Sequence, residues 1–126
     1  MDWRDMAGNA PTEQKMRIIE EWVPGKQISL AHIIAHPDAA LLTHFGFSEN
    51  AVGNAIGIVT VTPSEASLIV ADIAIKTSGV HLECVGKESG TVLVTGTVSQ
   101  VESALRALID YTEKKLGFTV CEVTQN

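Results

Sequence analysis

The sequence has 126 residues, of which 45% are hydrophobic and 19% are charged, and its formal net charge is −6. This length suits one domain with a short arm, and a chain so apolar and so weakly charged is expected to fold. The 9 lysines and arginines are scattered along an acidic chain, which argues against nucleic-acid binding. No stretch reaches the ~18 uninterrupted apolar residues of a membrane-spanning helix, so we expect no membrane partner.

The first elements in chain order are a tail and a strand. Residues 1–15 are polar and contain glycine and proline, which is typical of a mobile tail. They show no apolar core of a secretory signal, so we expect a cytoplasmic protein. Residues 16–23 (MRIIEEWV) predict a strand that ends at the turn signal Pro24-Gly25. Trp22, beside this turn, fits either the core or a contact with another subunit.

Residues 27–36 (QISLAHIIAH) are rich in β-branched and apolar side chains and predict a second strand. A short helix is expected over residues 38–47, because Asp38 can cap its start and Gly46 can end it.

Residues 54–61 give the clearest strand signal, and a strong helix start follows them. Thr62 is a suitable N-cap, Pro63 suits the first helical position, and Glu65 stands three residues after the cap. The predicted helix runs to about Thr77. Its sequence is apolar on nearly all sides, which indicates burial on more than one side and therefore contact with neighbouring subunits.

Two further strands are expected over residues 81–85 and 91–98, joined by a hairpin turn. Ser99 and Glu102 have the spacing of a capping box, so a helix is predicted to begin there. Its expected buried side carries Val101, Ala104, Leu105, Leu108, Ile109 and Leu116.

Gly117 ends this helix, and residues 118–123 predict a last strand. From residue 54 the expected order is β-α-β-β-α-β, the split βαβ arrangement of ferredoxin-like folds. An extra β-β-α unit precedes it.

The titratable residues do not form a convincing catalytic or metal-binding set. His32 and His36 are four residues apart, but in a strand they are expected to be structural or interface residues rather than metal ligands. Glu20 and Glu21 are adjacent in a predicted strand and point to opposite faces. Cys84 and Cys121 form no CxxC pair, and we expect reduced, buried thiols. We therefore predict no catalytic, cofactor or metal residues.

Three segments carry a resemblance to a known family: residues 21–37 (EWVPGKQISLAHIIAHP), 55–66 (AIGIVTVTPSEA) and 91–105 (TVLVTGTVSQVESAL). They resemble bacterial microcompartment (BMC) shell proteins of the circularly permuted, hexamer-forming type found in ethanolamine and propanediol utilisation compartments. The resemblance covers about residues 17–124. It implies an α+β sandwich: a ferredoxin-like, circularly permuted BMC domain over residues 26–126, preceded by a strand extension at 16–25.

In function, the resemblance implies a structural shell subunit and not an enzyme. Such a chain would form a cyclic homohexamer that tiles with other shell proteins around enzymes handling a reactive aldehyde, with no cofactor. The N-terminal strand of each subunit would join a six-stranded parallel barrel that covers a central pore. The residues of that strand would be Arg17, Ile18, Ile19, Glu20, Glu21 and Trp22.

The resemblance also gives candidates for the pore and for the tile edge. The ordinary pore loop aligns with a shorter one here, namely Gly86, Lys87, Glu88, Ser89 and Gly90. Six copies of Lys87 and Glu88 would make charged rings that bias ion passage; the alternative is a plain exposed turn. The ordinary domain has an edge-contact lysine whose matching position here is Thr62, so tiling by that lysine is in question.

Two other classes of function are weighed against the shell subunit. A ferredoxin-like sensor would bind a metabolite at a dimer interface, and an enzyme would need an acid, base, nucleophile or metal set. The sequence shows neither the converging polar residues that a sensor would need nor the catalytic set that an enzyme would need. A sensor predicts dimers, whereas a shell protein predicts hexamers, sheets or tubes.

Overall fold

The computed structural model describes residues 26–126, so the predicted tail 1–15 and the predicted strand segment 16–25 lie outside the described residues. The described chain forms one five-stranded sheet of order β3-β4-β2-β1-β5. Neighbouring strands are antiparallel except β1 and β5, which are parallel. The elements are β1 Gln27–Ile34, α3 Ala39–His44, the 3-10 turn η1 Glu49–Ala51, β2 Ala55–Thr62, the 3-10 turn η2 Ser64–Ala66, α4 Ser67–Ser78, β3 His81–Gly86, β4 Thr91–Gly96, α5 Val98–Leu116 and β5 Thr124–Gln125.

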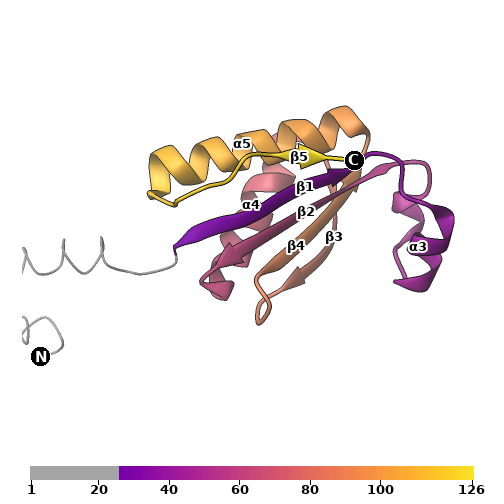
Figure 1. Cartoon of the computed structure of the whole chain (residues 1–126), viewed down its shortest axis with the longest axis horizontal. Helices are drawn as coiled ribbons and strands as arrows, with labels where there is room; N and C mark the ends of the chain where they lie inside the picture. Colours follow the sequence, from indigo (N-terminus) through magenta and orange to yellow (C-terminus); the bar gives the residue numbers. More distant parts are fainter. Residues whose placement is uncertain (1–25) are drawn as a thin grey trace, which may run out of the picture.

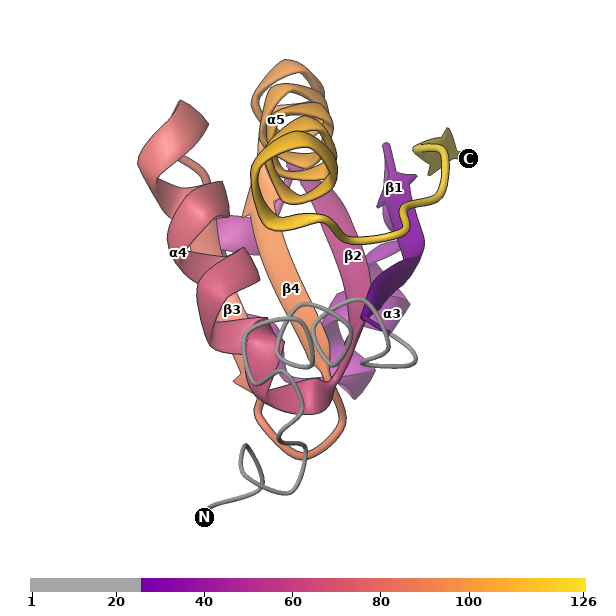
Figure 2. The ribbon, with the colours of Figure 1, turned by 90° about the vertical axis from the view of Figure 1, so that its left-hand side faces the viewer.

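Helices α4 and α5 lie side by side on one face of the sheet (Figures 1 and 2). The main core fills the space between them and the strands. On α5 the predicted buried side is confirmed: Val101, Ala104, Leu105 and Leu108 are buried, because their spacing places them on one helical face. Ile109 and Leu116 of that side are partly buried.

Gly57, in the middle of β2, lets the sheet approach α5 closely. A Cβ atom at this position would lie 2.7 Å from Cγ1 of Val101, so any side chain would force the packing against α5 to shift. The mixed sheet with α4 and α5 on one face confirms the α+β fold predicted from the sequence.

The opposite face of the sheet is covered over only part of its area. The short helix α3 lies there, and Leu42, Ala51 and Ile56 form a second, smaller buried cluster beneath it. The predicted cap is confirmed, since the Asp38 side chain accepts a hydrogen bond from the Ala40 backbone N–H at 2.8 Å.

The predicted starts of both long helices were wrong. Helix α5 is capped by Thr97 and Gln100, which exchange hydrogen bonds, and not by Ser99 and Glu102 two residues later. Both pairs fit the same sequence pattern, and the pair directly after β4 forms the box.

Helix α4 is preceded by the 3-10 turn η2, and no side chain caps the start of either element. The predicted N-cap Thr62 is instead the last residue of β2, where it pairs with Gln27 and precedes a cis bond to Pro63. Thr62 therefore belongs to the β-sheet and does not cap the helix, in contrast to what the capping pattern predicts.

The predicted last strand over 118–123 was also wrong. In this stretch only Thr119 bridges to the sheet, at Gln27, and the strand proper is β5, two residues long. Cys84 is exposed and Cys121 is partly buried, so the expectation of two buried thiols fails for Cys84, which lies on an edge strand. Both are free thiols.

Candidate pore hairpin and contact surfaces

The candidate pore loop is a tight hairpin turn between β3 and β4. Lys87, Glu88 and Ser89 are exposed at its tip. The Gly90 N–H donates to the Gly86 carbonyl at 2.7 Å, which closes the turn. The predicted hairpin is confirmed, and the geometry leaves both charged side chains of the tip in solvent.

Gly90 also fixes the hairpin to the neighbouring strand. Its carbonyl accepts a hydrogen bond from the Val61 N–H at 2.8 Å, and its φ is +75°. A Cβ atom there would lie 2.3 Å from the Val61 carbonyl oxygen. The position therefore requires glycine for its backbone conformation and for space.

The hairpin, the end of β2 and the start of β1 all lie at the same end of the sheet (Figure 1). Pairing shows this directly, because Gln27 is opposite Thr62 and Thr60 is opposite Thr91. The described chain thus begins beside the candidate pore hairpin. The barrel residues Arg17 to Trp22 lie outside the described residues.

Helix α4 exposes three large apolar side chains. Leu68 is 53% exposed, Ile69 is 47% exposed and Ile75 is 41% exposed, whereas Val70 and Ala74 on the sheet side are buried. A helix with apolar residues on its outer face needs a further partner to cover them.

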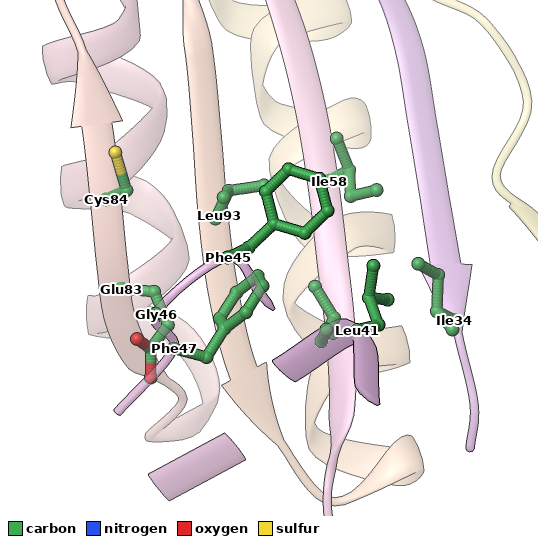
Figure 3. Close-up of a pocket in the computed structure, with 10 residues that line it drawn as sticks. Ile34, Leu41, Phe45, Gly46, Phe47, Ile58, Glu83, Cys84 and Leu93 are labelled. Carbon is green, nitrogen blue, oxygen red and sulfur yellow. The ribbon is translucent and has the colours of Figure 1, made fainter. Parts of the chain in front are cut away.

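On the other sheet face, an apolar pocket of about 330 Å³ opens between α3 and the strands (Figure 3). In the close-up, Phe45, Phe47 and Leu41 lie in front of the strands, with the long helices behind. The pocket is lined by Ile34, Leu41, Phe45, Gly46, Phe47, Ile56, Ile58, Glu83, Cys84 and Leu93. Phe45 is 67% exposed at its mouth.

Glu83 is the polar wall of this pocket, and sequence reasoning missed it. Its side chain is only 7% exposed. The carboxylate accepts hydrogen bonds from Ser48 N–H at 3.2 Å, Ser48 Oγ at 2.5 Å and Thr95 Oγ1 at 3.2 Å. Nε2 of His81 is 3.8 Å away. Burial opposes ionisation of the carboxyl group, but the hydrogen bonds from Ser48 and Thr95 outweigh it and lower the pKa of Glu83.

The histidines weighed as metal ligands have separate surroundings. Both ring nitrogens of His32 are hydrogen-bonded near the C-terminus, Nδ1 to Thr124 Oγ1 at 2.6 Å and Nε2 to Asn126 Oδ1. His36 is exposed beyond the end of β1. Within residues 26–126 no group of three His, Cys, Asp or Glu side chains is placed to hold a metal ion.

Burial raises the pKa of the Cys121 thiol, which disfavours the nucleophilic thiolate. In the described part of the chain, no helix is both long enough and apolar enough to cross a bilayer.

Comparisons with known proteins agree on one family. The family model described as BMC domain matches residues 55–124. The chain is 43% identical over 112 residues to the bacterial microcompartment shell protein EutS of Salmonella typhimurium, covering 89% of this chain and 98% of EutS. It is 45% identical over 109 residues to the shell protein PduU of the same organism, covering 86% and 92%.

Among solved structures, the CutR flat hexamer superposes with a TM-score of 0.77 and 36% identity, covering 82% of this chain and 94% of that one. These relatives are structural shell proteins and not enzymes. The chain belongs to the BMC domain family of microcompartment shell proteins.

Proposed function

We propose that this chain is a structural subunit of a bacterial microcompartment shell and assembles as a closed ring of six copies. The observation that carries the proposal is the likeness to the CutR flat hexamer, which extends over 82% of the chain. The proposed location is the shell of a microcompartment inside the cell, beside other shell proteins.

The outer face of α4 supports a ring. Leu68 and Ile75 are seven residues apart and therefore share one stripe of the helix. In a heterologous contact, this stripe would be covered by a different surface of the next copy, and such a contact closes after a fixed number of copies. The proposal assigns this stripe to the ring interface.

The sixfold axis is assigned to the β3–β4 hairpin, residues 86–90. Its exposed Lys87 and Glu88 would form two charged rings at a central pore and bias the passage of ions. Thr62 lies against this hairpin, because Val61 N–H bonds to the Gly90 carbonyl. If the hairpin lies at the sixfold axis, Thr62 is too close to that axis to form contacts at the outer edge of the hexamer. We therefore assign the hairpin to the pore and do not assign Thr62 to the edge.

The barrel over the pore is the finer part of the proposal. The described chain begins at Lys26 and Gln27, at the same end of the sheet as the hairpin. If the hairpins surround the axis, six segments of residues 17–22 start around it too. A lone terminal strand is unstable in water, whereas six strands related by symmetry close a barrel without exposed edges.

The family match supports a circular permutation. It begins at residue 55, the first residue of β2, and leaves β1 and α3 outside. We infer that β1 and α3 are the elements that come last in the unpermuted domain. The resemblance to ethanolamine and propanediol utilisation shells extends the proposal to a coat around enzymes that handle a reactive aldehyde.

The test is the native mass of the full chain by light scattering after size exclusion, with electron microscopy of the same sample. We expect a mass of six chains, or larger sheets and tubes. The double variant Leu68→Glu/Ile75→Glu should fall to smaller species, because the charges would be buried at the interface. Val52→Glu is the matched control, since Val52 is 69% exposed and lies outside α4. A monomer or dimer for the wild type would overturn the ring.

A further inference from the structure

A second apolar groove lies where the described chain begins. It has a volume of about 370 Å³ and runs between the start of α4 and the end of α5. Pro63, Ala66 and Ile69, at and before the start of α4, line it together with Leu116 and Phe118, at and after the end of α5. Lys26 and Glu65 are its charged lining residues. The groove is thus mainly apolar and carries two opposite charges.

The apolar wall of this groove is incompletely covered by the described residues. Ile69 is 47% exposed, although its neighbour Val70 is fully buried. A side chain placed on Ile69 would remove apolar surface from water at about 25 cal/mol per Å². The groove therefore favours an apolar occupant.

The chain enters at the rim of the groove and is fixed there. The Lys26 carbonyl accepts a hydrogen bond from Thr119 N–H at 3.1 Å, and Ile28 N–H donates to the Thr119 carbonyl at 2.8 Å. Nζ of Lys26 lies 5.5 Å from the centre of the Phe118 ring. The described chain therefore begins beside Phe118 and Thr119.

The sequence just before Lys26 is a turn signature. In Val23-Pro24-Gly25-Lys26, proline stands at the second position and glycine at the third, as in a type II turn. Such a turn brings the first and fourth Cα atoms to within about 7 Å of each other. It would return the chain to the rim of the groove, with Trp22 as the next residue.

We propose that Trp22 docks in the groove of its own chain, between Ile69 and Phe118. A tryptophan buries about 150–250 Å² of surface, which is a suitable cover for an exposed isoleucine. The Glu65 carboxylate, which also lines the groove, would be the acceptor for the indole N–H. The sequence left two alternatives for Trp22, the core of its own subunit or a contact with another subunit. The proposal favours the core of its own subunit.

Docking of Trp22 would fix the direction in which residues 17–21 leave the domain. The contact uses one chain only, so it holds whether or not six such segments close a barrel. The native mass reports on the ring, and the environment of Trp22 reports on the groove, so the two proposals fail separately.

The first test is the fluorescence of the full chain with Trp3→Phe, which leaves Trp22 as the single tryptophan. We expect emission shifted to shorter wavelength than in denaturant, and weak quenching by acrylamide. Adding Ile69→Glu should shift the emission back toward the value of the unfolded chain. Val52→Glu should leave it unchanged. Emission of the folded protein equal to that in denaturant, or unaffected by Ile69→Glu, overturns the proposal.

A second test separates the chain's own groove from that of a neighbour. In a background of Cys84→Ser and Cys121→Ser, which keeps Trp22 and Ile69, Val23→Cys and Glu65→Cys are joined with a short bismaleimide. We expect a product that runs as one chain under denaturing conditions and has lost both free thiols. Cross-linked dimers would place Trp22 in the next subunit and overturn docking within the chain. Trp3→Cys with Glu65→Cys is the matched control and should be cross-linked more slowly.

Discussion

Glu83 connects two segments that are 35 residues apart in sequence. Its carboxylate holds both the backbone N–H and the hydroxyl of Ser48, the residue that caps η1. This contact fixes the α3–η1 segment on the open face of the sheet and closes one side of the apolar pocket. Hydrogen bonds to a charged, nearly buried acceptor contribute about 1.5–3 kcal/mol, so this residue is expected to matter for stability.

We expect Glu83→Gln to lower the free energy of unfolding at neutral pH by about 1–3 kcal/mol. The pKa of Glu83 is lowered by folding, so its ionised form stabilises the protein above the ordinary value of 4.5. As the pH falls from that value through the lower pKa of the folded state, the unfolded chain takes up the proton first. The wild type then loses this stability, and the difference between the two proteins shrinks.

Urea unfolding of both proteins across this pH range measures the effect. Glu88→Gln is the control, because Glu88 is exposed at the hairpin tip, where surface charge contributes little. A constant difference between wild type and Glu83→Gln at every pH would show that the ionised carboxylate is not the stabilising form.

Glu83 shows which part of the site the sequence cannot reveal. Ser48 followed by Glu49 and Asn50 is a recognisable cap, but nothing local indicates that its partner comes from β3. In contrast, the hairpin tip at Lys87 and Glu88 was predictable, because a turn depends on neighbouring residues. A contact between residues far apart in the sequence can be predicted only when the order of the strands is already known.

At the scale of elements, the hairpin depends on Gly90. We expect Gly90→Ala to lower the free energy of unfolding by about 2–4 kcal/mol, combining the left-handed backbone with a forced shift of β2. Gly53→Ala is the matched control, since Gly53 has φ +76° but nothing within 4 Å of the added Cβ. It should lose only about 1–2 kcal/mol. Equal losses, measured by urea unfolding, would mean that the approach to Val61 carries no cost.

The elements also show why boundaries were harder to predict than the elements themselves. The repeat of the buried face located α5, because that face extends over many residues. The start of α5 was predicted wrongly because a capping pattern is short and occurs twice there, at Thr97 and at Ser99. The end of β4 decides between them, and that end is set by pairing with β2.

At the scale of the whole molecule, the start of the described chain, the groove lined by Lys26 and Pro63, and the hairpin lie at one end of the sheet. The strand order β3-β4-β2-β1-β5 places the first strand inside the sheet and makes β3 and β5 its edges. The order of elements was readable from the sequence, but this gathering follows only from the pairing of Gln27 with Thr62. This pairing places the start of the described chain at the same end of the sheet as the hairpin of the proposed pore.

Deleting residues 1–21 should leave the ring of six intact and uncover the pore. Every strand of the described sheet, together with helices α4 and α5, lies within residues 26–126, and this deletion keeps Trp22 for the proposed docking. Averaged electron micrographs should show density over the axis in the wild type and an opening ringed by the hairpins in the deletion. Removing only residues 1–15 is the control and should keep the density. A smaller native mass for the longer deletion would assign residues 16–21 to the ring interface, and an unchanged axis would place the barrel strand elsewhere.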